Sequence, residues 1–322
     1  MRKIILCALV FIFVSFYILA ETTKEHDFRF SIGTSIGILA GKSEEIVYRD
    51  GNSSEKLSQL LWQFKPLVYA GLDFHYIWFG QETGAYFFTG LYFKYGLPGG
   101  SGLMEDRDWL IDQSPDLLTH YSVHDNTTNS AFLIDADVGG SFGFLRELRL
   151  KLYFSYSYMT FSWTASGGSF LYPDYNGGHV PGSGDCGTYT QIWQILSPGF
   201  SFYGTFYRIF DFELSFRASP LVWCYDKDEH LLKGLVINDY LFGGVFMEPG
   251  LLFSFKPVSF LSLSTSVSYR YISGTRGDAV YHRKGRPAST YENSSGAGYS
   301  AFNISITAKF LLFKDRRPAG LR

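Results

Sequence analysis

Apolar and polar side chains alternate with a period of two along several long stretches of the chain. Residues 148–157, 210–217 and 261–271 place an apolar or aromatic side chain at nearly every second position, with mostly polar residues between them. Successive side chains of a β-strand point to opposite faces, so the two faces of these strands meet different environments. The pattern predicts an all-β protein.

Similar stretches recur along the whole chain, and the connections between them follow a second rule. Ten strands are predicted, over residues 28–41, 57–74, 84–96, 130–145, 147–164, 189–206, 209–223, 238–256, 260–273 and 297–313. Long connections, centred on 42–56, 97–129, 165–188, 224–237 and 274–296, alternate with short ones such as Tyr207-Arg208. An even strand number with long loops at one rim and tight turns at the other is typical of an outer-membrane barrel. We therefore expect a ten-stranded antiparallel transmembrane β-barrel with long extracellular loops and short periplasmic turns.

Composition agrees with strands rather than helices. The chain has 322 residues, of which 23 are Tyr, 31 Phe, 6 Trp and 34 Gly. A mean hydropathy of 0.00 with 18% charged residues excludes a bundle of membrane helices. The formal charge of -2 gives no cationic excess, so no nucleic-acid partner is expected.

The N-terminus predicts export. Arg2 and Lys3 precede an apolar run that ends at Ala20, which fits a secretory signal peptide over residues 1–20. Residues 21–322 would then form a single barrel domain, with 314–322 as a solvated tail. In an oxidising compartment Cys186 and Cys224 could pair, and the alternative is two free thiols.

Candidate chemistry is confined to two acidic segments on the predicted long loops. The chain has no HExxH, phosphate-loop or CxxC motif. Asp106-Arg107-Asp108-Trp109 lies in the second long connection and Asp226-Lys227-Asp228-Glu229-His230 in the fourth. In extended backbone, residues two apart project to the same side. A hydrated loop is the ordinary explanation for either cluster alone, because Asp is common in turns.

Together with four other segments, these two clusters resemble the omptins, the outer-membrane endopeptidases of bacteria. The resembling segments occur in the family order over nearly the whole mature chain, and they are Gly41-Lys42-Ser43-Glu44-Glu45-Ile46-Val47-Tyr48, Lys56-Leu57-Ser58-Gln59-Leu60-Leu61-Trp62, Met104-Glu105-Asp106-Arg107-Asp108-Trp109, Thr164-Ala165-Ser166-Gly167-Gly168-Ser169, Asp226-Lys227-Asp228-Glu229-His230 and Ser295-Gly296-Ala297-Gly298.

The resemblance implies an active-site groove at the outer end of the barrel. Asp106 and Asp108 would face Asp228 and His230 across it, and the two pairs would activate a water that attacks the scissile carbonyl without a covalent intermediate. It also implies that Glu45 and Asp226 line the pocket for a basic side chain preceding the cut. The expected substrates are therefore peptides and proteins with Arg or Lys, including dibasic sites.

The chemistry of these residue types suits such a reaction. A histidine titrates near neutral pH, and a neighbouring aspartate fixes its tautomer and stabilises the imidazolium. Two carboxylates as close as Asp106 and Asp108 do not ionise independently, so one can keep a proton and donate it to the oxyanion or the leaving amine. The residues do not decide which of the two aspartates does so.

The chain departs from the family on the outer wall. Family members hold lipopolysaccharide with basic residues, but Thr160 and Ile192 stand where arginines are expected and Tyr158 where a glutamate is, although Tyr156 is retained. Without cations the lipid phosphates lose their partners, so dependence on lipopolysaccharide is not expected; the bound outer-membrane lipid is then a different one or absent, and activation by a lipid stays open. No cofactor is expected. A zinc site from Asp226, Asp228 and His230 ranks below the water-activating pairs, because no further spaced ligand cluster accompanies them.

The leading hypothesis is an aspartic-type outer-membrane endopeptidase that acts as a monomer with its site facing the exterior. The alternative is a non-catalytic surface barrel, an adhesin or host-protein binder, which would not need Asp106, Asp108, Asp228 and His230 together. A porin is disfavoured, because the interior of so small a barrel is nearly filled by side chains.

Overall fold

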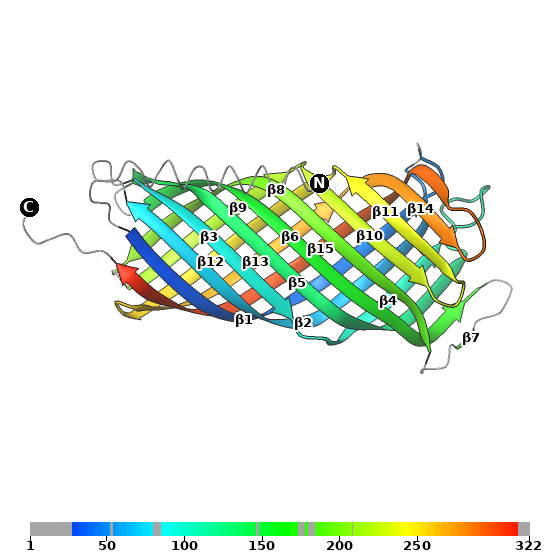
Figure 1. Ribbon diagram of the computed structural model, residues 1–322, viewed down its shortest axis with the longest axis horizontal. Coiled ribbons are helices and arrows are strands. Elements are labelled where there is room, and N and C mark those ends of the chain that lie inside the picture. Colours follow the sequence, from blue (N-terminus) through cyan, green and yellow to red (C-terminus); the bar gives the residue numbers. More distant parts are fainter. Residues whose placement is uncertain are drawn as a thin grey trace, which may run out of the picture.

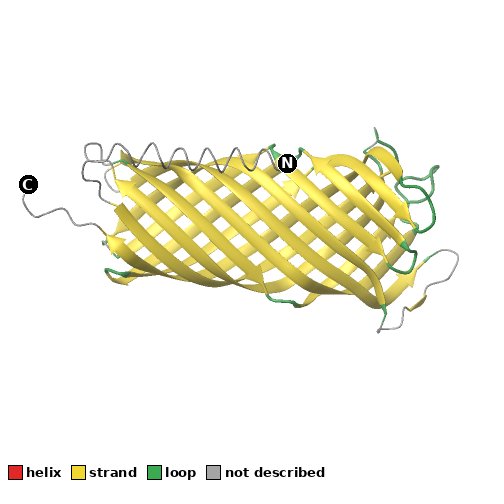
Figure 2. Ribbon diagram, in the orientation of Figure 1, coloured by secondary structure: helices red, strands yellow, loops and turns green. Residues whose placement is uncertain are grey.

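The computed structural model describes residues 28–51, 54–79, 85–145, 148–172, 178–179, 184–207 and 209–314. They form one elongated barrel of antiparallel strands (Figures 1 and 2). The strands are β1 (Phe28–Tyr48), β2 (Lys56–Phe79), β3 (Tyr86–Gly96), β4 (Gly99–Asp108), β5 (His120–Leu145), β6 (Leu148–Leu171), β7 (Gly178–His179), β8 (Asp185–Phe206), β9 (Phe210–Ser219), β10 (Val222–His230), β11 (Leu235–Phe242), β12 (Val245–Val258), β13 (Leu261–Ser273), β14 (Arg276–Arg283) and β15 (Ser289–Lys314). No helix of the described chain is long and apolar enough to cross a membrane.

Strand pairing closes the sheet twice, at two levels of the cylinder. The membrane ring runs β1–β2–β3–β5–β6–β8–β9–β12–β13–β15 and returns to β1. The outer ring runs β1–β2–β4–β5–β6–β8–β10–β11–β14–β15 and also returns to β1. Every described strand of the two rings is paired on both sides, which strands in lipid require, and the short β7 pairs with β6 outside the rings.

The wall of the barrel is interrupted at four places between the two rings, two of them within the predicted strands 209–223 and 238–256 and two at the ends of the predicted strands 84–96 and 260–273. Pro98 separates β3 from β4, Pro220 separates β9 from β10, and glycines separate β11 from β12 and β13 from β14. Gly244 has a φ of 89°. A Cβ there would lie 2.3 Å from the carbonyl oxygen of Ser273. The interruptions explain why the structure has more strand segments than the sequence predicts.

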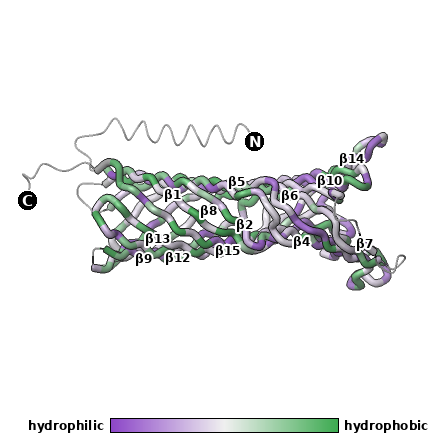
Figure 3. Tube along the Cα trace, turned by 90° about the horizontal axis from the view of Figure 1, so that it is seen from below, coloured by the Kyte–Doolittle hydropathy of each residue, from purple (hydrophilic) through white to green (hydrophobic). Residues whose placement is uncertain are grey.

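Exposed apolar side chains mark the part of the barrel that lies in lipid. Ile36, Phe87, Phe154 and Ile306 on the membrane ring are each at least 60% exposed. Hydrophobic and hydrophilic residues alternate along the strands of this half, around β9, β12 and β13 (Figure 3). The outer ring instead carries charged pairs on its outward face, such as Lys42 with Glu44. The alternation follows from lipid outside and polar groups inside.

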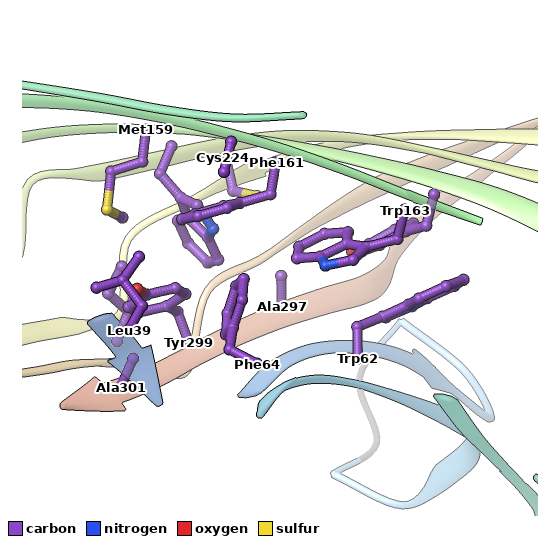
Figure 4. Packing of buried hydrophobic residues seen from close by; sticks show 14 of the residues in the cluster. Leu39, Trp62, Phe64, Met159, Phe161, Trp163, Cys224, Ala297, Tyr299 and Ala301 are labelled. Atoms are coloured by element: carbon purple, nitrogen blue, oxygen red, sulfur yellow. The ribbon is translucent and has the colours of Figure 1, made fainter. Parts of the chain in front are cut away.

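An aromatic layer fills the lumen where the two rings meet (Figure 4). The centroids of the Phe64 and Phe161 rings lie 5.0 Å apart, and those of Phe161 and Tyr299 lie 5.6 Å apart. Trp62 stacks on Tyr189 at 5.3 Å. These side chains are almost fully buried. The layer forms the floor of the outer end of the barrel.

Below the aromatic layer, buried charges form an ion-pair network. Arg270 donates from Nη2 to Asp135 Oδ1 at 3.0 Å and from Nε to Glu248 Oε2 at 2.9 Å. Arg217 also pairs with Asp135 and with Glu248. Further toward the periplasmic end, the lumen holds a polar cavity of about 1090 Å³. The membrane ring thus balances its buried charges internally.

Several sequence predictions need correction. The outer parts of the predicted long connections are strands, so Asp106 and Asp226 lie in β4 and β10 rather than in loops. The sequence missed this because the segments around Asp106 in β4 and Asp226 in β10 carry polar residues on both faces.

The thiols are free rather than paired. Cys186 and Cys224 form no disulfide. Cys224 lies opposite Trp193. Trp193 is seven residues from Cys186 along β8, a separation of roughly 23 Å that no disulfide spans.

The predicted termini are only partly described. Lys314, the first residue of the predicted tail, is the last residue of β15. The rest of that tail and the predicted signal peptide lie outside the described residues.

The ion-pair network makes Arg270 a test of the membrane ring. Arg270→Met should destabilise the barrel by about 3–5 kcal/mol, because the buried carboxylates of Asp135 and Glu248 each lose one of their ion-pair partners. Lys42→Met, which removes the exposed partner of Glu44, should cost about 1 kcal/mol or less. Samples would be heated to a series of temperatures and run on SDS gels without boiling. The measurement is the temperature at which the fast-migrating band of the folded barrel disappears. Equal losses in the two variants would contradict a stabilising role for the network.

Candidate active site at the outer end of the barrel

Asp106 and Asp108 are fixed by strand pairing on both sides of β4. Asp106 pairs with Leu60 of β2 and with Ser122 of β5. Asp108 is two residues further along the same strand, where it pairs with His120. Residues two apart share a face, so both carboxylates belong to one side of β4.

β10 carries the second acidic segment with a regular alternation. Asp226 and Asp228 are buried on the inward face. Lys227 and Glu229 point outward and form an ion pair with each other. Since Lys227 points outward, Asp226 and Asp228 have no Lys or Arg of their own strand beside them.

Asp228 and His230 form a hydrogen-bonded pair. His230 Nε2 lies 2.6 Å from Asp228 Oδ2. Burial lowers the pKa of His230, but the hydrogen bond and the charge of Asp228 raise it more, so that the pKa lies above its ordinary value of 6.5. With Nε2 committed to Asp228, Nδ1 is the nitrogen left to accept a proton.

Asp106 is half-buried, with its Oδ1 atom inaccessible to solvent, and it is electrostatically coupled to the opposite pair. Burial, followed by repulsion from Asp108, raises the pKa of Asp106 to about 7. His230 and Lys233 lower it, and Asp228 raises it. Because β4 is separated from β10 by three strands of the outer ring on one side and by five on the other, this coupling acts across the lumen. The structure therefore brings the two predicted pairs to one level of the barrel.

Glu45 and Asp226 lie deeper, just above the aromatic layer. Glu45 on β1 is 1% exposed and Asp226 is 0% exposed. Tyr189 donates from its hydroxyl to Asp226 Oδ2 at 3.0 Å. Gln191 donates to the Tyr189 hydroxyl at 2.8 Å and accepts from Ser43 of the opposite wall. This chain of hydrogen bonds ties β1 to β8 and forms a rigid floor beneath the acids.

Sequence reasoning missed one acid of the site, Asp239. It lies on β11, directly opposite Asp226, and is fully buried. The inward face of β11 is otherwise apolar, with Leu235, Ile237 and Leu241. An acid in that alternation was the available signal, but the predicted strand began only at residue 238.

The residues of the outer wall lie where a strand alternation puts them. Tyr156, Tyr158 and Thr160 alternate along β6 with the buried Met159 and Phe161, so they face outward. Ile192 is the cross-strand partner of Thr160. Thr160 and Ile192, the two positions at which the resemblance implies arginines, are therefore neutral residues on this surface.

The donor geometry gives no support to the zinc alternative. No group of three or more His, Cys, Asp or Glu among the residues the structure describes is arranged to hold a metal ion. The arrangement can instead hold a water between a basic imidazole and a carboxyl group that keeps a proton near neutral pH.

Known proteins resemble the chain over nearly all of its length. The Omptin family model matches residues 26–312. The plasminogen activator of Yersinia pestis is 28% identical over 87% of this chain and 88% of its own. The outer membrane protease IcsP of Shigella flexneri is 26% identical over 87% of this chain and 90% of its own. The crystal structure of outer membrane protease OmpT from Escherichia coli superposes with a TM-score of 0.81 at 21% identity, covering 90% of this chain and 99% of that one.

The buried acids predict a pH-dependent stability that Asp239→Asn should reveal. Burial raises the pKa of Asp239 from 3.8 to about 6. The folded protein then binds more protons than the unfolded chain between these values, so stability falls as pH rises through this window. The free energy of unfolding of the asparagine variant should equal that of wild type near pH 4 and should be larger by about 3 kcal/mol above pH 6.

Unfolding midpoints in detergent over pH 4–8 would measure this difference. Asp116→Asn, which removes an exposed carboxylate of the same rim, should track wild type at every pH. A pH-independent difference between Asp239→Asn and wild type would contradict a raised pKa.

Proposed function

The chain belongs to the omptin family, and from this premise we propose that it is an outer-membrane endopeptidase that cleaves peptides and proteins at basic residues. The family and the names of the relatives support a protease of the outer membrane. The finer statements, on mechanism and specificity, rest on the geometry of the outer site.

The observation that carries the mechanism is the electrostatic coupling of Asp106 to Asp228 and His230 across the lumen. A water between the two pairs would lose its proton to His230 as its oxygen attacks the scissile carbonyl. Asp228 would stabilise the imidazolium that forms. The peptide oxygen would become an oxyanion, and no bond to the enzyme would form.

Asp106 is the better candidate for the proton donor. Its pKa of about 7 keeps much of it protonated at neutral pH. A protonated Asp106 can donate to the oxyanion or to the leaving amine, while Asp108 stays on the same face to orient the water. This acid–base pairing is aspartic-type chemistry in which a histidine supplies the base.

Specificity would come from Glu45 and Asp226. Both carboxylates are buried beside the proposed catalytic pairs, and no described residue forms an ion pair with either. A lysine or arginine side chain preceding the cut would supply the missing charge through charge-assisted hydrogen bonds. A neutral side chain would leave both carboxylates unpaired.

Lipid activation, if present, would differ from phosphate recognition by arginines. Tyr156, Tyr158, Thr160 and Ile192 present aromatic rings, a hydroxyl and an alkyl group on the outward wall, and no cation. We therefore propose that the enzyme works without lipopolysaccharide.

Loss of His230 should abolish the proposed reaction. His230→Ala, and Asp106→Ala combined with Asp108→Ala, should each lower kcat for a quenched dibasic peptide by at least about 100-fold. His282→Ala should retain activity, because His282 is exposed on β14. Refolded mature protein, assayed with and without added lipopolysaccharide, would provide the measurement. Equal turnover in all variants would remove the mechanism, and turnover only with the lipid would contradict lipid independence.

Neutralising the pocket should weaken the use of basic substrates. Glu45→Gln or Asp226→Asn should lower kcat/KM for peptides with Arg or Lys before the cut by about 10-fold or more. Glu44→Gln is the matched control, since Glu44 is half-exposed and pairs with Lys42. Peptides that differ only at the residue before the cut would be compared. Unchanged selectivity in Glu45→Gln would refute the pocket assignment.

A further inference from the structure

Asp239 adds a third acid beside the two carboxylates of the proposed pocket. It is the direct cross-strand partner of Asp226, and both side chains are fully buried on the inward face. Directly opposite residues on antiparallel strands have Cβ atoms only about 5 Å apart. Like charges in this position repel each other unless something compensates them.

The three acids have neutral hydrogen-bond partners at most. Tyr189 donates to Asp226, Asp226 and Asp239 hydrogen-bond to each other, and Ser295 hydrogen-bonds to Asp239. Glu45 Oε1 and Oε2 are buried and have no hydrogen-bond partner among the described residues. Glu45 is the clearest case, because it is 1% exposed and neither oxygen is used. Buried polar groups are nearly always satisfied, so these oxygens indicate a site built for a partner that brings donors.

The electrostatics agree with a site that binds a cation. Burial, and then the charge of neighbouring acids, raises the pKa of Glu45 and of Asp226 well above ordinary values. The groups that face this cluster are mainly acids, namely Asp106 and Asp228, with Tyr189 and Tyr281 beside them. The described part of the chain provides no Lys or Arg ion pair to any of the three acids.

We propose that Asp239 is a specificity-determining residue of the pocket for the side chain before the cut, and that its carboxylate makes the pocket select arginine over lysine. The proposal rests on the proposed function for the identity of the ligand. It goes beyond that function by adding a residue and by separating the two basic side chains.

The reason for arginine is the number and spread of donors. The guanidinium is planar and has five N–H donors on a rigid fork, whereas an ammonium has three donors around a single point. Buried carboxylates from β1, β10 and β11 surround the site, and none of them forms an ion pair within the described chain. A flat ion with donors on two edges can bridge Asp226 and Asp239 and still reach Glu45. A compact ammonium would leave part of this set unpaired.

A purely structural role for Asp239 makes a different prediction. If Asp239 only positioned Asp226, its loss would weaken arginine and lysine substrates alike. If it binds the guanidinium, its loss should act mainly on arginine. The ratio of the two substrates therefore separates the roles.

The test uses the refolded mature chain and two probes that cannot be hydrolysed. Calorimetry at pH 8 would compare butylguanidinium, which mimics arginine, with pentylammonium, which mimics lysine. Wild type should bind butylguanidinium at least about tenfold more tightly. Asp239→Asn, an isosteric change, should bring the ratio close to one, chiefly by weakening butylguanidinium. Asp239→Glu should retain part of the preference, and Asp116→Asn all of it.

The same variants would then be assayed with peptides that carry Arg or Lys before the cut. The ratio of kcat/KM values should fall with the binding ratio in Asp239→Asn. An unchanged ratio in either assay, or no binding of butylguanidinium by wild type, would overturn the role of Asp239. Asp239-dependent binding without hydrolysis of any peptide would support the arginine pocket and refute the peptidase. Hydrolysis with an unaltered ratio would leave the peptidase standing and remove only this proposal.

Discussion

The need to pair every backbone N–H and C=O in lipid organises this molecule. Strands can meet it only by closing on themselves, and closure determines which side chains face lipid and which face the lumen. The outer ring continues the same closed sheet beyond the apolar band. Its acids are therefore held by hydrogen-bonded neighbours on both sides, with a precision that a flexible loop would not supply.

The two rings treat buried charge in opposite ways. In the membrane ring, Arg217 and Arg270 compensate Asp135 and Glu248 through direct ion pairs. At the outer end, the cluster around Glu45 and Asp226 has no such partner among the described residues. Uncompensated burial destabilises a protein, so its persistence in a rigid frame points to function rather than to stability.

The sequence predicted the membrane ring well and the outer ring poorly, for one physical reason. Where lipid lies outside the barrel, apolar and polar side chains alternate clearly, as in residues 210–217. Such strands can be predicted from the sequence. Where water is outside, both faces are polar, as in Asp226-Lys227-Asp228-Glu229, and the same strand resembles a loop. The position of Asp239 depends on the register of β11 against β10, which one sequence does not encode locally. Whether Cys186 and Cys224 form a disulfide also depends on strand register, so the sequence could not decide it.

In the proposed reaction, recognition and charge compensation are the same event. The empty pocket keeps several acids close together at a cost that burial increases, and part of that cost is relieved by protonation. A basic side chain that enters replaces those protons with a cation that is already part of the substrate. Its binding fixes the following peptide bond above the pocket, at the level of Asp106 and His230. Selectivity thus follows because no described Lys or Arg of the barrel forms an ion pair with the acids of the pocket. Such a residue would stabilise the fold, but it would also occupy the place of the substrate side chain.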